Sequence, residues 1–256
     1  MSPKRRSKKK KSVLETAQPE ESKSQSSSWI FVAFALAGVC VFALVLLGTE
    51  PPPRPTPPPA VHPVDAWRAL PVQPVSYAPE RDFARGPEDA AVSILTFSDF
   101  ECQHCRDANM ELERLRQRYP EDVQIVFKNY PLDMACNENM TRPNFLHSCK
   151  AAVMSRCAGA QDRFWDMHDA IYTLPRLSVS ALDALPVELG VAGEAYDACI
   201  ASEEPMRAIH ADIDQGRTLG VTGTPSVFIN GRKMPSFRAQ TVETIVDHLA
   251  SESDGP

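Results

Sequence analysis

Apolar residues along this chain change their spacing in a way that predicts alternating strands and helices. Residues 91–97 and 123–127 are short runs rich in β-branched and aromatic side chains, as in buried strands. The stretch 102–119 between them carries apolar residues at helical spacing, and Pro120 ends it. A strand, a helix and a second strand in this order predict parallel strand pairing through a right-handed crossover.

The second half of the chain predicts more helix before the sheet resumes. Residues 143–219 have a mostly helical pattern, interrupted near prolines and glycines. A short strand over 226–229 and an Asn230-Gly231 turn follow, and a final amphipathic helix covers about 241–251. The sequence therefore predicts an α/β domain over 80–256 with a helical insertion at about 143–219.

Two cysteines at the start of the first helix carry the candidate chemistry. Cys102 and Cys105 are separated by Gln103 and His104, and a strand delivers them to the helix N-terminus. Unpaired backbone N–H groups and the helix dipole stabilise a thiolate at such a position, which favours thiol–disulfide exchange. Two cysteines at this spacing also occur as half of a zinc site, so the motif alone leaves both interpretations open.

A proline far downstream favours the first interpretation. Thr224-Pro225 leads directly into the strand 226–229, and an ordered proline in that position can have a cis peptide bond. We expect a cis bond here, with the Thr224 backbone beside the sulfur of Cys102. Thr224 and Pro225 are therefore candidate site residues.

Together these motifs resemble the DsbA-like periplasmic thiol–disulfide oxidoreductases of the thioredoxin superfamily. The resemblance covers about residues 87–249 and rests on segments that follow in the family order, 97–105, 123–132, 161–168 and 219–225. It implies a thioredoxin-like α/β fold with an inserted helical subdomain, and an enzyme without cofactor or metal. We expect Cys102 to be the nucleophile and Cys105 to resolve the mixed disulfide.

His104 lies between these two cysteines. We expect its imidazole to stabilise the Cys102 thiolate and so to make the disulfide more oxidising, above about −200 mV against roughly −270 mV for thioredoxin. The alternative is an exposed polar residue without such a role.

The chain also departs from the family pattern. The best-known DsbA oxidases carry a buried glutamate six residues before the nucleophile, where this chain has Thr96. Neither Asp99 nor Glu101 obviously replaces it, so the proton acceptor for Cys105 stays open. Lys128 matches a lysine near the active site of the family, or is an ordinary charge at a strand end.

Four further cysteines, an even number, favour two structural disulfides. Cys149 and Cys157 are eight residues apart on one expected helix, about 12 Å along its axis, too far to pair with each other. We expect Cys136 to pair with Cys149 and Cys157 with Cys199, because these loops are shorter than in the crossed arrangement. A zinc site that uses these thiols and His147 is the less favoured alternative.

The N-terminal quarter predicts a membrane anchor. Residues 1–28 form a basic, Ser-rich tail, and the uncharged segment 29–48 is long enough to span the hydrocarbon core. We expect residues 49–79 to form a Pro-rich linker in an extended conformation. A cleaved signal peptide is the alternative to the anchor. Cys40 lies inside the apolar segment and is expected to face lipid or pack there.

Charge suggests the orientation of the chain. Residues 1–28 carry a net charge of +5 and the remainder −11. The basic tail is typical of a segment that stays in the cytoplasm and fixes the topology. The acidic remainder argues against a nucleic-acid partner. We expect a single-pass protein of a bacterial inner membrane with its catalytic domain in the periplasm.

The expected function is a thiol oxidase that acts on unfolded or reduced exported proteins. A membrane quinone-linked partner, DsbB-like or vitamin K epoxide reductase-like, would reset it. The alternatives are a periplasmic disulfide reductase or isomerase, and a client-binding domain without turnover.

Overall fold

The computed structural model describes residues 61–79, 81–142 and 145–253, together with Phe34, Leu36 and Gly38. The chain divides into two compact units, Met1–Pro58 and Pro59–Pro256. The basic tail, the first part of the Pro-rich linker and most of the expected anchor lie outside the described residues. Within the described part of the chain, no helix has the length and apolar character needed to cross a membrane.

A five-stranded sheet forms the centre of the second unit, in the order β1-β3-β2-β4-β5. Strands β2 (Val92–Ser98) and β3 (Val123–Asn129) pair in parallel, as the sequence predicts, with Ile94 opposite Ile125. The other pairings are antiparallel, and they involve β1 (Phe83–Arg85), β4 (Ser226–Ile229) and β5 (Arg232–Lys233).

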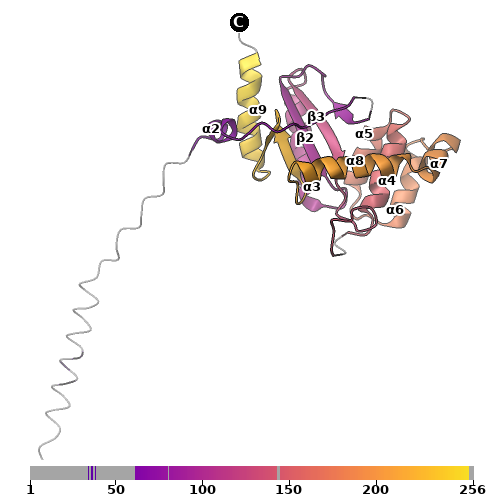
Figure 1. Cartoon of the computed structure of the whole chain (residues 1–256), viewed down its shortest axis with the longest axis horizontal. Helices are drawn as coiled ribbons and strands as arrows, with labels where there is room; N and C mark the ends of the chain where they lie inside the picture. The colour runs from indigo at the N-terminus through magenta and orange to yellow at the C-terminus, as the bar shows by residue number, and fades with distance from the viewer. Residues whose placement is uncertain are drawn as a thin grey trace, which may run out of the picture. The chain divides into compact units, whose positions relative to one another are not determined.

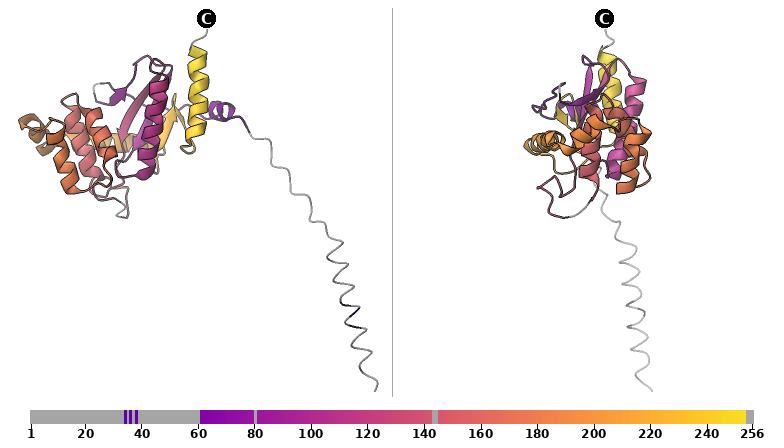
Figure 2. Two further views of the ribbon diagram at one scale, coloured as in Figure 1. Left: turned by 180° about the vertical axis from the view of Figure 1, so that it is seen from behind. Right: turned by 90° about the vertical axis from the view of Figure 1, so that its right-hand side faces the viewer.

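Helices cover both faces of this sheet because adjacent residues on a strand point to opposite sides. On one face, α3 (Gln103–Arg118) and α9 (Ala239–Ser253) pack on the side chains of Ile94 and Ile125. On the other, α8 (Glu204–Thr218) packs on Leu95 and Val126. Figure 1 shows α8 running across the front of the sheet, and Figure 2 shows α3 on the opposite side.

Four further helices gather at the side of the sheet away from α9 (Figure 1). They are α4 (Ser148–Gly159), α5 (Phe164–Thr173), α6 (Val179–Glu188) and α7 (Glu194–Ala201). The expected insertion, 143–219, also included α8, and this was wrong. Ile209 and Ile213 of α8 are buried against the sheet, and a helical pattern alone does not tell which surface a helix covers.

The expected linker, 49–79, extends too far toward the C-terminus. Residues Pro63–Arg68 form helix α2, and Trp67 is buried and donates a hydrogen bond from Nε1 to the Ile229 carbonyl at 3.3 Å. Val72 forms a β-bridge with Arg232. Pro63 stands at the start of α2, where proline favours a helix, so the high proline content did not indicate an extended linker there.

Two disulfides hold the insertion together. Cys136 is bonded to Cys149 and Cys157 to Cys199, with S–S distances of 2.10 and 2.04 Å. This is the arrangement with the shorter loops. The first bond fastens the segment after β3 to α4, and the second fastens α4 to α7.

Candidate active site

The two remaining described cysteines meet at the N-terminus of α3, where the sequence analysis places them. Cys102 is the N-cap residue of this helix, and both cysteines are free thiols. Cys102 is 7% exposed and Cys105 is completely buried, so a second protein can reach only the sulfur of Cys102. The Thr224–Pro225 peptide bond is cis, and the Cys102 thiol donates a hydrogen bond to the Thr224 carbonyl oxygen at 3.6 Å.

The environment of the two sulfurs separates their pKa values. A hydrogen bond from the Cys105 thiol is the largest cause that lowers the pKa of Cys102 to about 5. Backbone N–H groups of Cys105 and His104 and the side chain of Thr224 lower it further, against the effect of burial. Burial raises the pKa of Cys105 far above its usual range, and the charge of Cys102 adds to this. Cys102 is therefore the thiolate and Cys105 the protonated thiol, as nucleophilic exchange requires.

His104 contributes to this site through its backbone. Its side chain is exposed, and its N–H group is among the causes that lower the pKa of Cys102. The expected role of its imidazole stays a prediction.

Asp99 is a site residue to which the sequence analysis assigned no role. Its Oδ1 accepts hydrogen bonds from the backbone N–H of Cys102 at 3.1 Å and of Glu101 at 2.6 Å, and from Ser148 Oγ at 2.8 Å. Its Oδ2 accepts one from the backbone N–H of Leu132 at 2.6 Å. One carboxylate thus joins the start of α3, the segment after β3 and the start of α4.

Burial also changes the acidity of Asp99. Only 1% of this residue is exposed, and desolvation raises the pKa of its carboxyl to about 6, although its hydrogen bonds act in the opposite direction. The Asp99 backbone N–H donates to Cys105 Sγ at 3.4 Å. An aspartate often accepts a hydrogen bond from the backbone N–H two residues further on, as Asp99 does from Glu101, and that was the available signal.

Neutral polar side chains occur on β2, which leads to the cysteines, and on α5 of the insertion. Thr96, at the position where the family resemblance places a glutamate, is buried and lies 3.0 Å, Oγ1 to Oγ, from Ser98. The Tyr172 hydroxyl donates to the Asp99 carbonyl at 3.3 Å and belongs to the same apolar cluster as Cys105. Nothing in the sequence pattern pointed to Tyr172, because it comes from the insertion.

Lys128 is neither a strand-end charge nor a partner of the cysteines. It is completely buried, and its Nζ lies 2.6 Å from Asp82 and 3.4 Å from Asp212 on α8. Its neighbour Phe127 packs in the cluster that holds Cys102, so the alternation along β3 points Lys128 to the opposite face. The match to the family lysine was wrong for this reason.

A family model described as Thioredoxin matches residues 79–248. The chain belongs to the thioredoxin family. The match covers the sheet, the two-cysteine helix start, the insertion and most of α9. Family membership and the geometry of Cys102 and Cys105 together give this domain the thiolate and the buried second thiol that thiol–disulfide exchange requires.

Curated relatives match part of this chain over a small part of their own length. The Na(+)/H(+) antiporter NhaA of Herminiimonas arsenicoxydans is 29% identical over 171 residues, which are 66% of this chain and 26% of the antiporter. The chain spans about a quarter of the length of the curated relatives it matches.

Solved structures share the fold. The catalytic domain of Proteus mirabilis ScsC has a TM-score of 0.56 at 18% identity, covering 68% of this chain and 92% of that domain. Wolbachia pipientis alpha-DsbA1 has a TM-score of 0.57 at 18% identity, covering 69% of this chain and 94% of the other. At these identities the likeness concerns the fold.

Proposed function

We propose that this protein is a membrane-anchored periplasmic thiol oxidase that passes the Cys102–Cys105 disulfide to exported proteins. The observation that carries the proposal is the pKa of Cys102, which lies at about 5. A thiolate that is stable at neutral pH favours the reduced form of the enzyme, so its disulfide is readily given away.

The transfer follows from the exposure of the two sulfurs. A client thiolate attacks Cys102 in the disulfide, a client–Cys102 disulfide forms, and Cys105 leaves with the electron pair and takes up a proton in its buried site. A second client thiolate then attacks the client sulfur of the mixed disulfide and expels Cys102 as a thiolate. The client has lost two electrons and two protons, and the enzyme holds both electrons as a thiolate and a thiol.

The low pKa of Cys102 assists both the direction and the rate of this step. At pH 7 a thiol of pKa about 5 is stabilised by about 3 kcal/mol relative to one of pKa 9, which corresponds to roughly 60 mV for a two-electron couple. A leaving group of low pKa also departs faster. Both effects favour oxidation of the client.

The proposed location is supported by the N-terminal sequence. The uncharged segment 29–48 would anchor the protein in the inner membrane, with the basic tail 1–28 in the cytoplasm. A DsbB-like or vitamin K epoxide reductase-like membrane protein would return the electrons to quinone. Reduced or unfolded exported proteins would be the clients.

Thiol trapping in growing cells tests the direction of electron flow. We expect Cys102 and Cys105 to be found mostly as the disulfide, and Cys105→Ser to accumulate mixed disulfides with exported proteins. Cys102→Ser is the matched control and should trap none. A pair that is mostly reduced in cells, with a potential near the roughly −270 mV of thioredoxin, would select the reductase or isomerase instead.

A further inference from the structure

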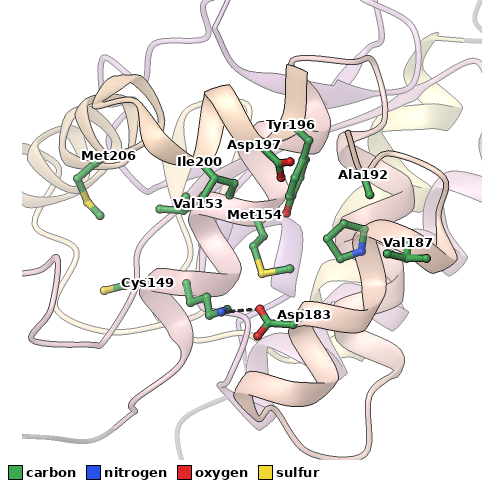
Figure 3. Close-up of a pocket in the computed structure, with 12 residues that line it drawn as sticks. Cys149, Val153, Met154, Asp183, Val187, Ala192, Tyr196, Asp197, Ile200 and Met206 are labelled. Atoms are coloured by element: carbon green, nitrogen blue, oxygen red, sulfur yellow. Dashed lines mark ion pairs between the residues drawn. The ribbon is translucent and has the colours of Figure 1, made fainter. Parts of the chain in front are cut away.

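A second concave site lies in the insertion, between α4, α6 and α7. It has a volume of about 520 Å³, which is within the range of ligand-binding pockets. Neither Cys102 nor Cys105 lines it. Its walls are mainly apolar, and Figure 3 shows the side chains that form them, which include Val153, Met154, Pro186, Val187, Ile200 and Met206.

Apolar side chains reach the solvent on two sides of this pocket. Val187 on α6 is 72% exposed and Ile200 on α7 is 40% exposed. Apolar residues scattered singly on a surface need no explanation, but here they lie at a hollow whose floor is apolar as well. An apolar group that entered the pocket would remove these side chains from water.

A hydroxyl group in the pocket has unused hydrogen-bonding capacity. Tyr196 is only 5% exposed, and its hydroxyl has no hydrogen-bond partner within 61–79, 81–142 and 145–253. Figure 3 shows this side chain pointing from α7 toward Met154. Burial, together with the nearby carboxylates of Asp183 and Asp197, raises the pKa of Tyr196 to about 12, so the hydroxyl keeps its proton at neutral pH. A carbonyl oxygen of an occupant would satisfy it.

The charges around the pocket favour a cation. Lys150 and Asp183 form an ion pair at 2.6 Å, drawn in Figure 3. Asp197 is exposed and has no ion pair with another described residue. The polar side of the pocket therefore carries one uncompensated negative charge.

The disulfides fix two walls of the pocket before anything binds. Cys149 lines it and is bonded to Cys136, and the Cys157–Cys199 bond fastens α7 to α4. A pocket whose walls are already in place loses less entropy on binding.

We propose that this pocket docks a polypeptide segment in which apolar side chains lie next to a lysine or arginine. The apolar side chains would fill the space between Val187 and Ile200, a backbone carbonyl would accept from Tyr196, and the cation would pair with Asp197. The inference rests on the proposed function and deepens it, because such a segment would belong to a client whose cysteines reach Cys102.

Calorimetry with a cysteine-free peptide tests the docking without any redox step. The probe is a peptide of about ten residues, with two leucines flanked by lysines between glycines and serines. Full-length protein in phosphatidylcholine nanodiscs is used, so that no free detergent competes for the pocket. We expect binding with one peptide per chain, and binding at least about five-fold weaker for peptides with glutamates in place of the lysines or serines in place of the leucines.

Matched variants locate the binding. Val187→Gln should weaken it about five-fold, whereas Val179→Gln should not, because Val179 is also an exposed valine of α6 but does not line the pocket. Asp197→Asn should weaken it about three-fold and reduce its salt dependence, whereas Glu194→Gln, on the same helix turn, should do neither.

Tyr196→Phe separates docking from fold stability. Because the hydroxyl has no partner among the described residues, this substitution should leave the urea midpoint unchanged or raise it. It should still weaken peptide binding about three-fold.

Several results would overturn the docking site. The first is an equal loss of peptide affinity in Val187→Gln and Val179→Gln. The second is an affinity that does not depend on the charge of the peptide, and the third is no binding at millimolar peptide. Self-association of the protein that Val187→Gln abolishes would assign the pocket to a second copy instead. Cys102→Ser should bind the peptide like the wild type, so loss of exchange chemistry and loss of docking are seen in separate assays.

Discussion

Replacing Cys105 with alanine tests the largest cause that lowers the pKa of Cys102. In the wild-type protein the Cys105 thiol donates a hydrogen bond to the Cys102 thiolate, and the pKa of Cys102 lies at about 5. A hydrogen bond to a charged group contributes about 1.5 to 3 kcal/mol, and about 1.4 kcal/mol changes a pKa by one. The pKa of Cys102 in Cys105→Ala should therefore rise to between about 6 and 7.

The rate of alkylation by iodoacetamide, measured against pH on reduced protein, reports this pKa directly. At pH 5 about half of the wild-type Cys102 is ionised. Cys105→Ala should reach half of its plateau rate about one to two pH units higher than the wild type, and its plateau rate above pH 9 should be higher because a thiolate of higher pKa is more nucleophilic.

Cys105→Ser is the matched control because its hydroxyl keeps a donor at the same place. Its alkylation profile should lie between those of the wild type and Cys105→Ala. A pKa of Cys102 in Cys105→Ala that stays at about 5 would refute the reasoning. It would mean that the backbone N–H groups at the start of α3 suffice to stabilise the thiolate.

Three further expectations concern the Cys157–Cys199 disulfide, Lys128 and Asp99. Alanine at both Cys157 and Cys199 should lower the free energy of unfolding by about 4 kcal/mol and leave the alkylation rate of Cys102 unchanged. An unchanged urea midpoint would contradict the predicted loss of stability. Lys128→Met removes the buried cation between Asp82 and Asp212, which keep only Arg81 and Arg156 as partners, so unfolding should become easier by about 3 kcal/mol. A change in the pKa of Cys102 in Lys128→Met would show that this lysine acts at the active site after all. The pKa of Asp99 is about 6 in the native state, against an ordinary 3.8, so the native state binds this proton more tightly than the unfolded state does. The wild-type free energy of unfolding should therefore fall by about 3 kcal/mol as the pH rises from below 4 to above 6. Asp99→Asn should remove that part of the pH profile in urea titrations, and an unaltered profile would exclude Asp99 as its source.

The features that the sequence predicts correctly depend on near neighbours or, for the disulfides, on the small number of possible pairings. The parallel strands β2 and β3 follow from apolar runs, and the start of α3 follows from the two cysteines that open a helical pattern. The disulfide arrangement follows from the geometry of one helix and the shorter loops.

The features that it missed depend on contacts between distant segments. Asp99 becomes a site residue because Leu132 and Ser148, 33 and 49 positions further along the chain, donate hydrogen bonds to it. Lys128 is buried because Asp82 and Asp212 come from elements on either side of it in sequence. Local spacing carries no information about such partners.

The two structural disulfides make this protein dependent on the chemistry that it is proposed to perform. Both bonds hold α4, and the second is the disulfide cross-link between α4 and α7. A newly made chain arrives with six thiols in its second unit and must lose four of them before its insertion is fixed in place. If the protein is the proposed oxidase, each new copy would be a client before it is an enzyme. Mature copies would then accelerate the production of further ones, and a cell that had lost all of them would recover activity only after a lag.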